Sequence, residues 1–174
     1  MKEVDPSIRF SFYSKAPPKQ MVLGVVGSDG QKCPIIFVAA GEQDNADVYQ
    51  GLLCPHVVPW LRRAYPDGNY VFQQDSAPAH TAKTTQEFLR NNTASYWTPE
   101  MWPPFSPDLN PLDYSIWSVL EAKVQEHAHD NLASLRATIK RQWAAMDAQY
   151  IVRTCSAFRR RLEAIIAAEG GHIE

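Results

Sequence analysis

The hydrophobic pattern of this chain changes its period along the sequence, and that change limits the folds it can form. Two apolar runs, Met21–Val26 and Pro34–Val38, flank the turn-forming residues Ser28-Asp29-Gly30. Apolar runs joined by such a turn predict a β-hairpin. From about residue 45 to residue 65, apolar residues instead recur every three or four positions, as they do on one face of an α-helix.

The remaining segments also place strands before helices. The alternation of Ile8, Phe10 and Phe12 with polar residues predicts a strand near the N-terminus. The segments that follow residue 65 predict, in chain order, a strand over Tyr70–Asp75, a helix over residues 80–91 and helices over about 111–169. Early strands and late helices predict a single α/β or α+β layered domain over residues 1–174.

A proline-rich segment separates the mixed part of the chain from the helical part. Residues 98–111 hold five of the 13 prolines. Because proline fixes φ and lacks an N–H, this density predicts a stiff loop without a regular element. At its end, Asn110 is a suitable N-cap and Pro111 occupies the favoured first helical position.

Composition excludes several classes of protein. The formal net charge is −2, so the chain as a whole has no basic character. Its longest apolar run, Ile35–Ala40, has six residues, and a membrane-spanning helix needs about 20. The three cysteines include no Cys-x-x-Cys pair, which argues against a disulfide scaffold or thiolate zinc site and favours a reducing compartment.

Two aspartates are candidates for metal chemistry. Asp75 ends a predicted strand, and Asp113 lies in the first turn of the helix after the proline-rich segment. A stiff connection can hold two carboxylates side by side, and paired carboxylate oxygens are natural ligands for Mg²⁺ or Mn²⁺.

Structural roles remain open for the same residues. Asp75 can polarise a strand end or cap the next helix. Asp113 follows Asn110 by three positions and can be the acidic member of a capping box. His80 fits a helix start as well as a ligand, so spacing alone offers a site without establishing one.

The C-terminal part is locally basic. Between residues 136 and 161 there are seven basic residues and one acid. They are Arg136, Lys140, Arg141, Arg153, Arg159, Arg160 and Arg161. Such residues can contact phosphates or can form a solvated helix face. Trp97 and Trp102 can stack on bases, but aromatic residues of a proline-rich loop favour packing onto the sheet.

Two sequence motifs carry a family resemblance. Residues 73–82 read QQDSAPAHTA and residues 102–114 read WPPFSPDLNPLDY. They resemble the second-aspartate and third-acid motifs of mariner-type (Tc/mariner superfamily) DDE/D transposases, with 37 residues between the two acids. Segments 21–26, 45–49 and 159–163 are also similar, so the resemblance extends over almost the whole chain.

The resemblance implies a ribonuclease H-like fold, with a mixed β-sheet flanked by helices. It implies a catalytic core for DNA cleavage and strand transfer, in which Asp75 and Asp113 hold two Mg²⁺ or Mn²⁺ ions and His80 helps to position that region. The implied partners are transposon ends and target DNA, with Arg153, Arg159, Arg160 and Arg161 as candidate DNA contacts. A homodimer, no membrane association and a nuclear location are expected, or a cytosolic one if the protein is inert.

The chain departs from the family at its N-terminus. The family's first acid lies on the central strand, upstream of the region matched by residues 15–24, so we expect that strand and that acid to be missing here. Asp5 is a candidate to replace the acid, and residues 7–13 are expected to fill part of the gap in the sheet. Loss of one ligand is expected to impair catalysis. The alternative function is an inactive remnant that binds DNA or a partner subunit.

Overall fold

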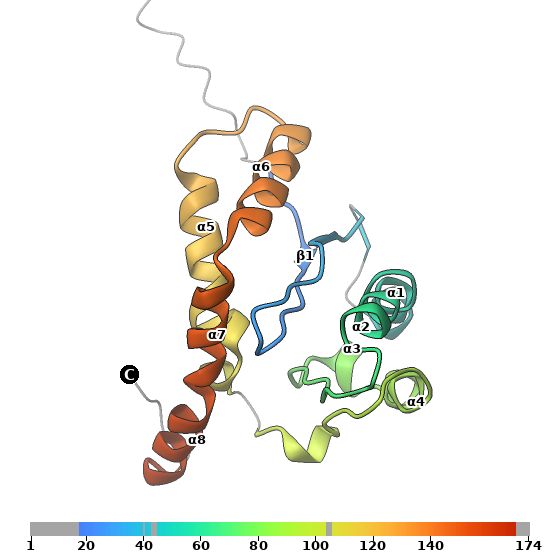
Figure 1. Ribbon diagram of the computed structural model, residues 1–174. Helices are drawn as coiled ribbons and strands as arrows, with labels where there is room; N and C mark the ends of the chain where they lie inside the picture. Colours follow the sequence, from blue (N-terminus) through green and yellow to red (C-terminus); the bar gives the residue numbers. More distant parts are fainter. Residues whose placement is uncertain (1–17, 40, 43–44, 104–105, 170–174) are drawn as a thin grey trace, which may run out of the picture.

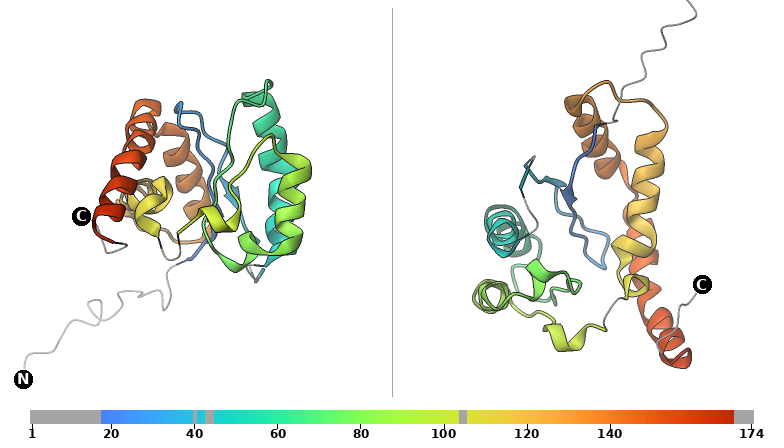
Figure 2. Two further views of the ribbon diagram at one scale, coloured as in Figure 1. Left: turned by 90° about the horizontal axis from the view of Figure 1, so that it is seen from below. Right: turned by 180° about the vertical axis from the view of Figure 1, so that it is seen from behind.

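The computed structural model describes residues 18–39, 41–42, 45–103 and 106–169, and it has three layers. A β-hairpin lies between two groups of helices (Figures 1 and 2). The predicted strand at residues 7–13, Asp5 and Gly170-Gly171, which the sequence predicts to end the last helix, lie outside the described residues. None of the described helices is both long and apolar enough to cross a membrane.

The hairpin forms where the turn and the apolar runs predict it. Strand β1 (Val22–Leu23) pairs antiparallel with β2 (Ile36–Phe37), and an isolated bridge joins Val26 to Lys32. Gly30 has φ +91°, a conformation that glycine adopts without strain. The regular strands are shorter than the predicted runs.

The first group of helices begins at Asn45, whose side chain accepts a hydrogen bond from the Val48 amide. Helix α1 (Ala46–Leu52), the π-helical turn η2 (Leu53–Val57) and α2 (Val58–Ala64) then follow without a break, as the pattern predicts.

The next two helices, α3 (Pro78–Thr81) and α4 (Lys83–Asn92), correct the single helix predicted over residues 80–91. Ala82 between them has ψ 138°, an extended conformation. The buried Thr85 hydroxyl donates to the carbonyl of Ala79, so a side chain satisfies a backbone acceptor near this break.

The second group of helices belongs to the C-terminal part. It contains the π-helical turn η5 (Leu112–Ile116), α5 (Trp117–Gln125), α6 (Leu132–Ala145), α7 (Ala148–Ser156) and α8 (Phe158–Ala167). Apolar residues recur at helical spacing from Ile151 to Ile165, a pattern that predicts one helix. The structure instead breaks this helix at Ala157. The break lets Phe158 pack against Trp97, with ring centroids 5.9 Å apart. This tertiary contact is not visible in the local periodicity.

The proline-rich segment is more ordered than predicted. It contains two 3₁₀ turns, η3 (Pro99–Met101) and η4 (Pro107–Leu109), each of which begins with a proline. The fixed φ of proline suits the first position of such a turn. Trp102 is buried and its ring lies 6.2 Å from that of Trp97, so the two rings pack against each other; packing onto the sheet stays a prediction.

The predicted strand at residues 70–75 is reduced to one bridge. Phe72 pairs in parallel with Tyr96. The Phe72 amide donates to the carbonyl of Ser95, and the Trp97 amide donates to the carbonyl of Phe72. Only one side of this extended segment is therefore paired among the described residues.

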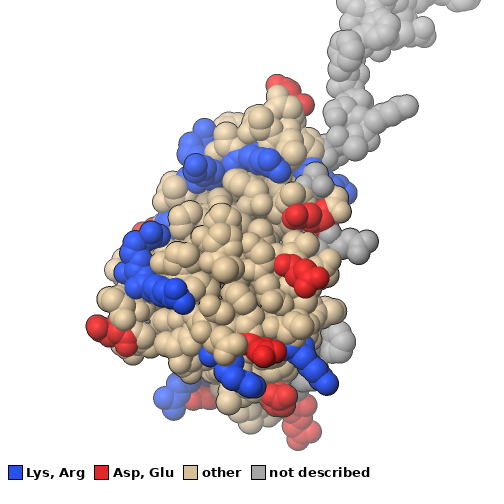
Figure 3. All heavy atoms as spheres, turned by 90° about the vertical axis from the view of Figure 1, so that its right-hand side faces the viewer, with Lys and Arg blue, Asp and Glu red and all other residues tan. Residues whose placement is uncertain are grey.

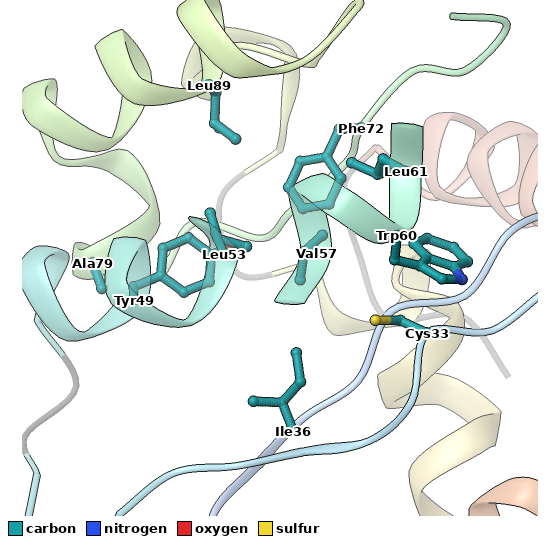
Figure 4. Close-up of a cluster of buried hydrophobic side chains, with 10 residues drawn as sticks. All are labelled: Cys33, Ile36, Tyr49, Leu53, Val57, Trp60, Leu61, Phe72, Ala79 and Leu89. Atoms are coloured by element: carbon teal, nitrogen blue, oxygen red, sulfur yellow. The ribbon is translucent and has the colours of Figure 1, made fainter. Parts of the chain in front are cut away.

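The hairpin separates two hydrophobic cores because strand side chains alternate between faces. Ile36 faces a core with Tyr49, Val57 and Trp60 from α1, η2 and α2 (Figure 4). Ile35 and Phe37 face the opposite core, which contains the following residues of the second helical group: Ile116, Leu120, Val124, Leu135, Ile139, Trp143, Met146 and Ile151. Burial on both faces of the hairpin holds the two helical groups together.

Gly24 permits the closest approach between the hairpin and α5 and α6. A Cβ atom at this position would lie 2.6 Å from Trp117 and 2.9 Å from Trp143. Gly24→Ala is therefore expected to lower the free energy of unfolding by about 2 kcal/mol, measured by urea denaturation. Gly51→Ala in α1 is the control, because no atom lies within 4 Å of its added Cβ. We expect this control to gain up to about 1 kcal/mol from helix propensity. Equal stability changes in the two variants would contradict the packing role of Gly24.

Candidate functional site

Asp75 lies just after the extended segment in which Phe72 bridges to Tyr96. Residues that closely follow it in the sequence fix its side chain. Its Oδ1 accepts a hydrogen bond from the Ala77 amide at 2.9 Å and lies 2.5 Å from Nδ1 of His80. These two contacts fix the orientation of the carboxylate. The other oxygen, Oδ2, has no hydrogen-bond partner among the described residues, so it is available to a ligand.

His80 is positioned by three neighbouring elements. Its carbonyl accepts hydrogen bonds from the side chains of Gln74 and Gln86, at 2.8 and 2.7 Å. Its ring lies 4.2 Å from that of Tyr49 in α1, and the Tyr49 hydroxyl donates to Oε1 of Gln74. The imidazole thus orients Asp75 from a position that is itself constrained.

Asp113 occupies the first turn of η5. The side chain of Asn110 accepts a hydrogen bond from the Leu112 amide, which confirms its capping role. The Asn110 amide donates instead to the carbonyl of Pro107. A capping box requires the backbone N–H of Asn110 to donate to the Asp113 carboxylate. That hydrogen bond is not formed, so Asp113 is not the acidic member of a capping box.

One cavity brings the two predicted acids together. Its volume is about 700 Å³, and Asp75, His80, Asn110 and Asp113 all line it. The cavity thus joins residues from the end of the extended segment, from α3 and from the start of η5. Asp29, in the hairpin turn, also lines it.

The two carboxyl groups respond oppositely to this environment. The hydrogen bond from His80 is the main reason that the pKa of Asp75 is lowered, although burial opposes it. Burial raises the pKa of Asp113, and the negative charge of Asp75 raises it further. Because Asp75 ionises first, the repulsion between the two groups is felt by Asp113.

This arrangement fits a divalent cation. Among the described residues, neither aspartate forms an ion pair with a lysine or arginine. Two neighbouring carboxylates that no lysine or arginine neutralises provide hard oxygen ligands and a local negative charge, which Mg²⁺ and Mn²⁺ prefer. No group of three or more His, Cys, Asp or Glu residues in the described ranges could hold a metal ion. The described residues thus contribute two carboxylates to the site.

The repulsion between the acids predicts a stability change in the metal-free protein. Asp113→Asn is expected to raise the free energy of unfolding at pH 7, because it removes a partly desolvated charge beside Asp75. A carboxyl whose pKa is raised by folding favours the folded state at low pH and loses that contribution as pH rises through its folded pKa. The gain should therefore be absent below about pH 4 and complete at neutral pH.

Urea denaturation in EDTA at several pH values measures this effect. Asp67→Asn, which changes an exposed aspartate in a turn, is the control and should leave stability unchanged. A loss of stability at pH 7 in Asp113→Asn would contradict the proximity of the two carboxylates.

The candidate DNA-contacting arginines do not have equivalent surroundings. Arg161 donates to the carbonyl of Asp108 at 2.6 Å and its guanidinium lies 4.3 Å from the centre of the Tyr114 ring. It thus ties α8 to the proline-rich segment. Arg153, Arg159 and Arg160 are exposed, and Arg159 pairs with Glu163. Figure 3 shows a different side of the molecule, the one on which α1 and α4 lie in Figure 1, and there charged side chains of both signs surround a mostly uncharged centre.

Sequence reasoning did not identify several supporting residues. Gln74 lies inside the quoted motif beside Asp75, so its position was a usable signal. Tyr49 and Gln86 act through contacts between separate elements, and their spacing in the sequence contains no sign of those contacts.

Comparison of sequences finds a family match and several relatives. Residues 41–136 match the DDE superfamily endonuclease family. The chain is 30% identical over 123 residues to the Tcb2 transposase of Caenorhabditis briggsae, covering 71% of this chain and 43% of that protein. It is 27% identical over 104 residues to the mariner Mos1 transposase of Drosophila mauritiana, covering 60% and 29%. The matches span less than half the length of these relatives.

Comparison of structures supports the same relationship. The Mos1 transposase catalytic domain, solved with raltegravir and Mg, superposes with a TM-score of 0.77 at 25% identity. The match covers 89% of this chain and 77% of that one. A Mos1 paired-end complex with Mn gives a TM-score of 0.79 at 25% identity over 99% of this chain and 51% of that one. These matches confirm the ribonuclease H-like fold expected from the sequence motifs.

Proposed function

Since the chain belongs to the DDE superfamily endonuclease family, we propose that it forms the catalytic core of a DNA transposase that cleaves and joins phosphodiester bonds. The observation that carries this proposal is the shared cavity of Asp75 and Asp113, together with the charge of Asp75 that raises the pKa of Asp113. The Tc1/mariner transposases to which the chain is similar provide independent support.

In this mechanism Asp75 and Asp113 are the metal-holding residues. Asp75 would contribute Oδ2, because its Oδ1 is engaged by His80 and Ala77. His80 acts as a positioning residue that keeps the carboxylate oriented and ionised. Two divalent ions in such a site supply activation of the attacking oxygen and stabilisation of the leaving oxygen in phosphoryl transfer. The Mos1 structures with Mg and with Mn support the choice of Mg²⁺ or Mn²⁺.

DNA is the proposed partner. The Mos1 paired-end complex with a transposon end supports this assignment. The exposed Arg153, Arg159 and Arg160 are proposed to contact DNA phosphates, whereas Arg161 holds α8 against Asp108. A nuclear location belongs to the same proposal, because the proposed substrate is chromosomal DNA, and a homodimer is proposed with it.

Nicking of supercoiled plasmid tests the proposed chemistry. We expect slow nicking by the 174-residue chain in Mg²⁺ or Mn²⁺, and loss of nicking when EDTA removes the metal. Slow turnover is expected because, among the described residues, no third potential ligand joins Asp75 and Asp113 in a group that could hold a metal ion. Nicking that persists in EDTA would contradict the proposed mechanism.

The second candidate function is DNA binding without catalysis, which the exposed arginines of α7 and α8 favour. A gel-shift titration at increasing salt distinguishes it. DNA binding that weakens steeply with salt, without metal-dependent nicking, would support this alternative over the enzyme.

A further inference from the structure

The turn that carries Asp113 is organised by Asn110. The backbone amides of Asp113 and Tyr114 both donate to the carbonyl of Asn110, at 2.9 and 3.0 Å. The Asn110 side chain accepts a hydrogen bond from the Leu112 amide, and it also hydrogen-bonds the Asp113 carboxyl group. The place of the Asp113 carboxylate in the cavity therefore depends on how the segment of residues 110–113 is held.

A single side chain from α8 contacts the residues on either side of this segment. Nε of Arg161 donates to the carbonyl of Asp108 at 2.6 Å, and its Nη2 lies 3.6 Å from Oδ1 of the same residue. The guanidinium carbon lies 4.3 Å from the centre of the Tyr114 ring. Asp108 comes two positions before residue 110, and Tyr114 directly follows residue 113. Arg161 thus joins the two ends of the segment that carries the acid.

The contacts of Arg161 are partly shielded from water. Its side chain is 23% exposed and that of Asp108 is 24% exposed. The side chain of Arg159, two positions earlier in α8, is 88% exposed. Because salt and water screen partly buried charges less than surface charges, the Arg161 contacts restrain the chain more firmly than the exposed pair formed by Arg159.

The Tyr114 ring is itself a fixed surface. Its hydroxyl donates to the carbonyl of Thr154 in α7 at 2.6 Å, and Thr154 is buried. The hydroxyl groups of Ser115 and Tyr150 lie 2.7 Å apart and join η5 to α7 a second time. The side of the segment that follows Asp113 is therefore anchored on α7, and the Arg161 contacts fix the preceding side relative to it.

These contacts require arginine rather than any cation. A guanidinium group is planar, so its edge can donate through Nε while its face lies over an aromatic ring. A lysine ammonium keeps the charge but has neither the Nε donor nor the flat face. Arg161 can thus hold the carbonyl of Asp108 and the ring of Tyr114 at the same time.

We propose that Arg161 is a positioning residue, which holds the segment of residues 110–113 in place and thereby keeps the Asp113 carboxylate at the cavity that it shares with Asp75. Arg161 acts through Asp108 and Tyr114, which it contacts directly. The inference rests on the proposed function in one respect, namely that Asp113 is a metal ligand. Residues that support a ligand in this way change metal affinity by about 10- to 100-fold when they are substituted.

Mn²⁺ titration separates positioning from a purely electrostatic effect. Arg161→Met removes a positive charge and leaves the negative charge of Asp108, so charge alone would strengthen cation binding. Positioning predicts the opposite, a loss of Mn²⁺ affinity of at least about tenfold, and Arg161→Lys should also bind more weakly than the wild type. Arg62→Met removes the same charge at an exposed position of α2 and should bind Mn²⁺ as the wild type does. Wild-type or tighter Mn²⁺ binding in Arg161→Met, or full affinity in Arg161→Lys, would overturn the proposal.

Hydrogen exchange in the metal-free protein, measured by mass spectrometry, tests the same contacts without a metal. In Arg161→Met we expect exchange in residues 109–116 to be at least about tenfold faster than in the wild type. Residues 78–92 in α3 and α4 should exchange equally in both proteins, and Arg62→Met should match the wild type. Unchanged exchange in residues 109–116 would overturn the proposal. A wild-type protein that binds no Mn²⁺ would contradict the proposed function, and the exchange result would still decide whether Arg161 holds the segment.

Discussion

Asp75→Asn is expected to lower the rate of metal-dependent plasmid nicking by more than about 100-fold. The change keeps the size of the side chain but removes its charge, and it weakens the contacts of Oδ1 with His80 and the Ala77 amide. A carboxylate that both orients and binds a cation cannot be replaced by a neutral amide. The measurement is the initial nicking rate in Mg²⁺ at neutral pH.

The matched control is Asp67→Asn, which makes the same chemical change at an exposed turn position. Its nicking rate should equal that of the wild type. Because the folded pKa of Asp75 is lowered, this carboxylate stabilises the fold above about pH 4 and loses that effect as pH falls. Nicking rates should therefore be compared at a temperature at which thermal denaturation curves show that both variants are fully folded. Equal nicking by Asp75→Asn and the wild type would remove Asp75 from the mechanism.

Trp143→Ala is expected to lower the free energy of unfolding by about 4 kcal/mol. Trp143 is 2% exposed and its ring stacks on Trp117 with centroids 5.8 Å apart. Its indole N–H donates to the carbonyl of Cys33 at 2.7 Å. The substitution removes the contact over Gly24 and leaves the Cys33 carbonyl without this donor, so it weakens the junction between the hairpin and α6.

Urea denaturation measures this loss, with two comparison variants. Ile166→Ala in α8 changes a side chain that is 67% exposed, and its stability should differ from the wild type by less than about 0.5 kcal/mol. Trp143→Phe retains an aromatic ring but lacks the indole donor. Its free energy of unfolding should lie between those of Trp143→Ala and Ile166→Ala. A Trp143→Ala protein as stable as Ile166→Ala would contradict the two-core arrangement around the hairpin.

Local sequence signals predict much of this fold. The turn at Ser28-Asp29-Gly30 and its flanking apolar runs predict the hairpin, and Asn45 and Asn110 both act as helix caps. These features depend on residues close together in the sequence. The break at Ala157 could not be predicted in this way, because it accompanies packing of Phe158 on Trp97, which is distant in the sequence.

Identifying the candidate site requires both the sequence motifs and the contacts of the folded structure. The family motifs identify Asp75 and Asp113, but spacing allows Asp113 to serve as a capping residue instead. The backbone bond from Asn110 to Pro107 decides against the capping box. The constraint on His80 by Tyr49 and its neighbours required the folded structure.

The most direct test of the account asks whether Asp75 and Asp113 share one cation. The metal-free protein is titrated with Mn²⁺, and electron paramagnetic resonance measures the bound and free Mn²⁺ at each step. The wild type, Asp75→Asn and Asp113→Asn are compared, with Asp67→Asn as the control. We predict that each site variant weakens Mn²⁺ binding at least about tenfold, while the control binds as the wild type does. Unchanged Mn²⁺ binding in either site variant would contradict a shared site.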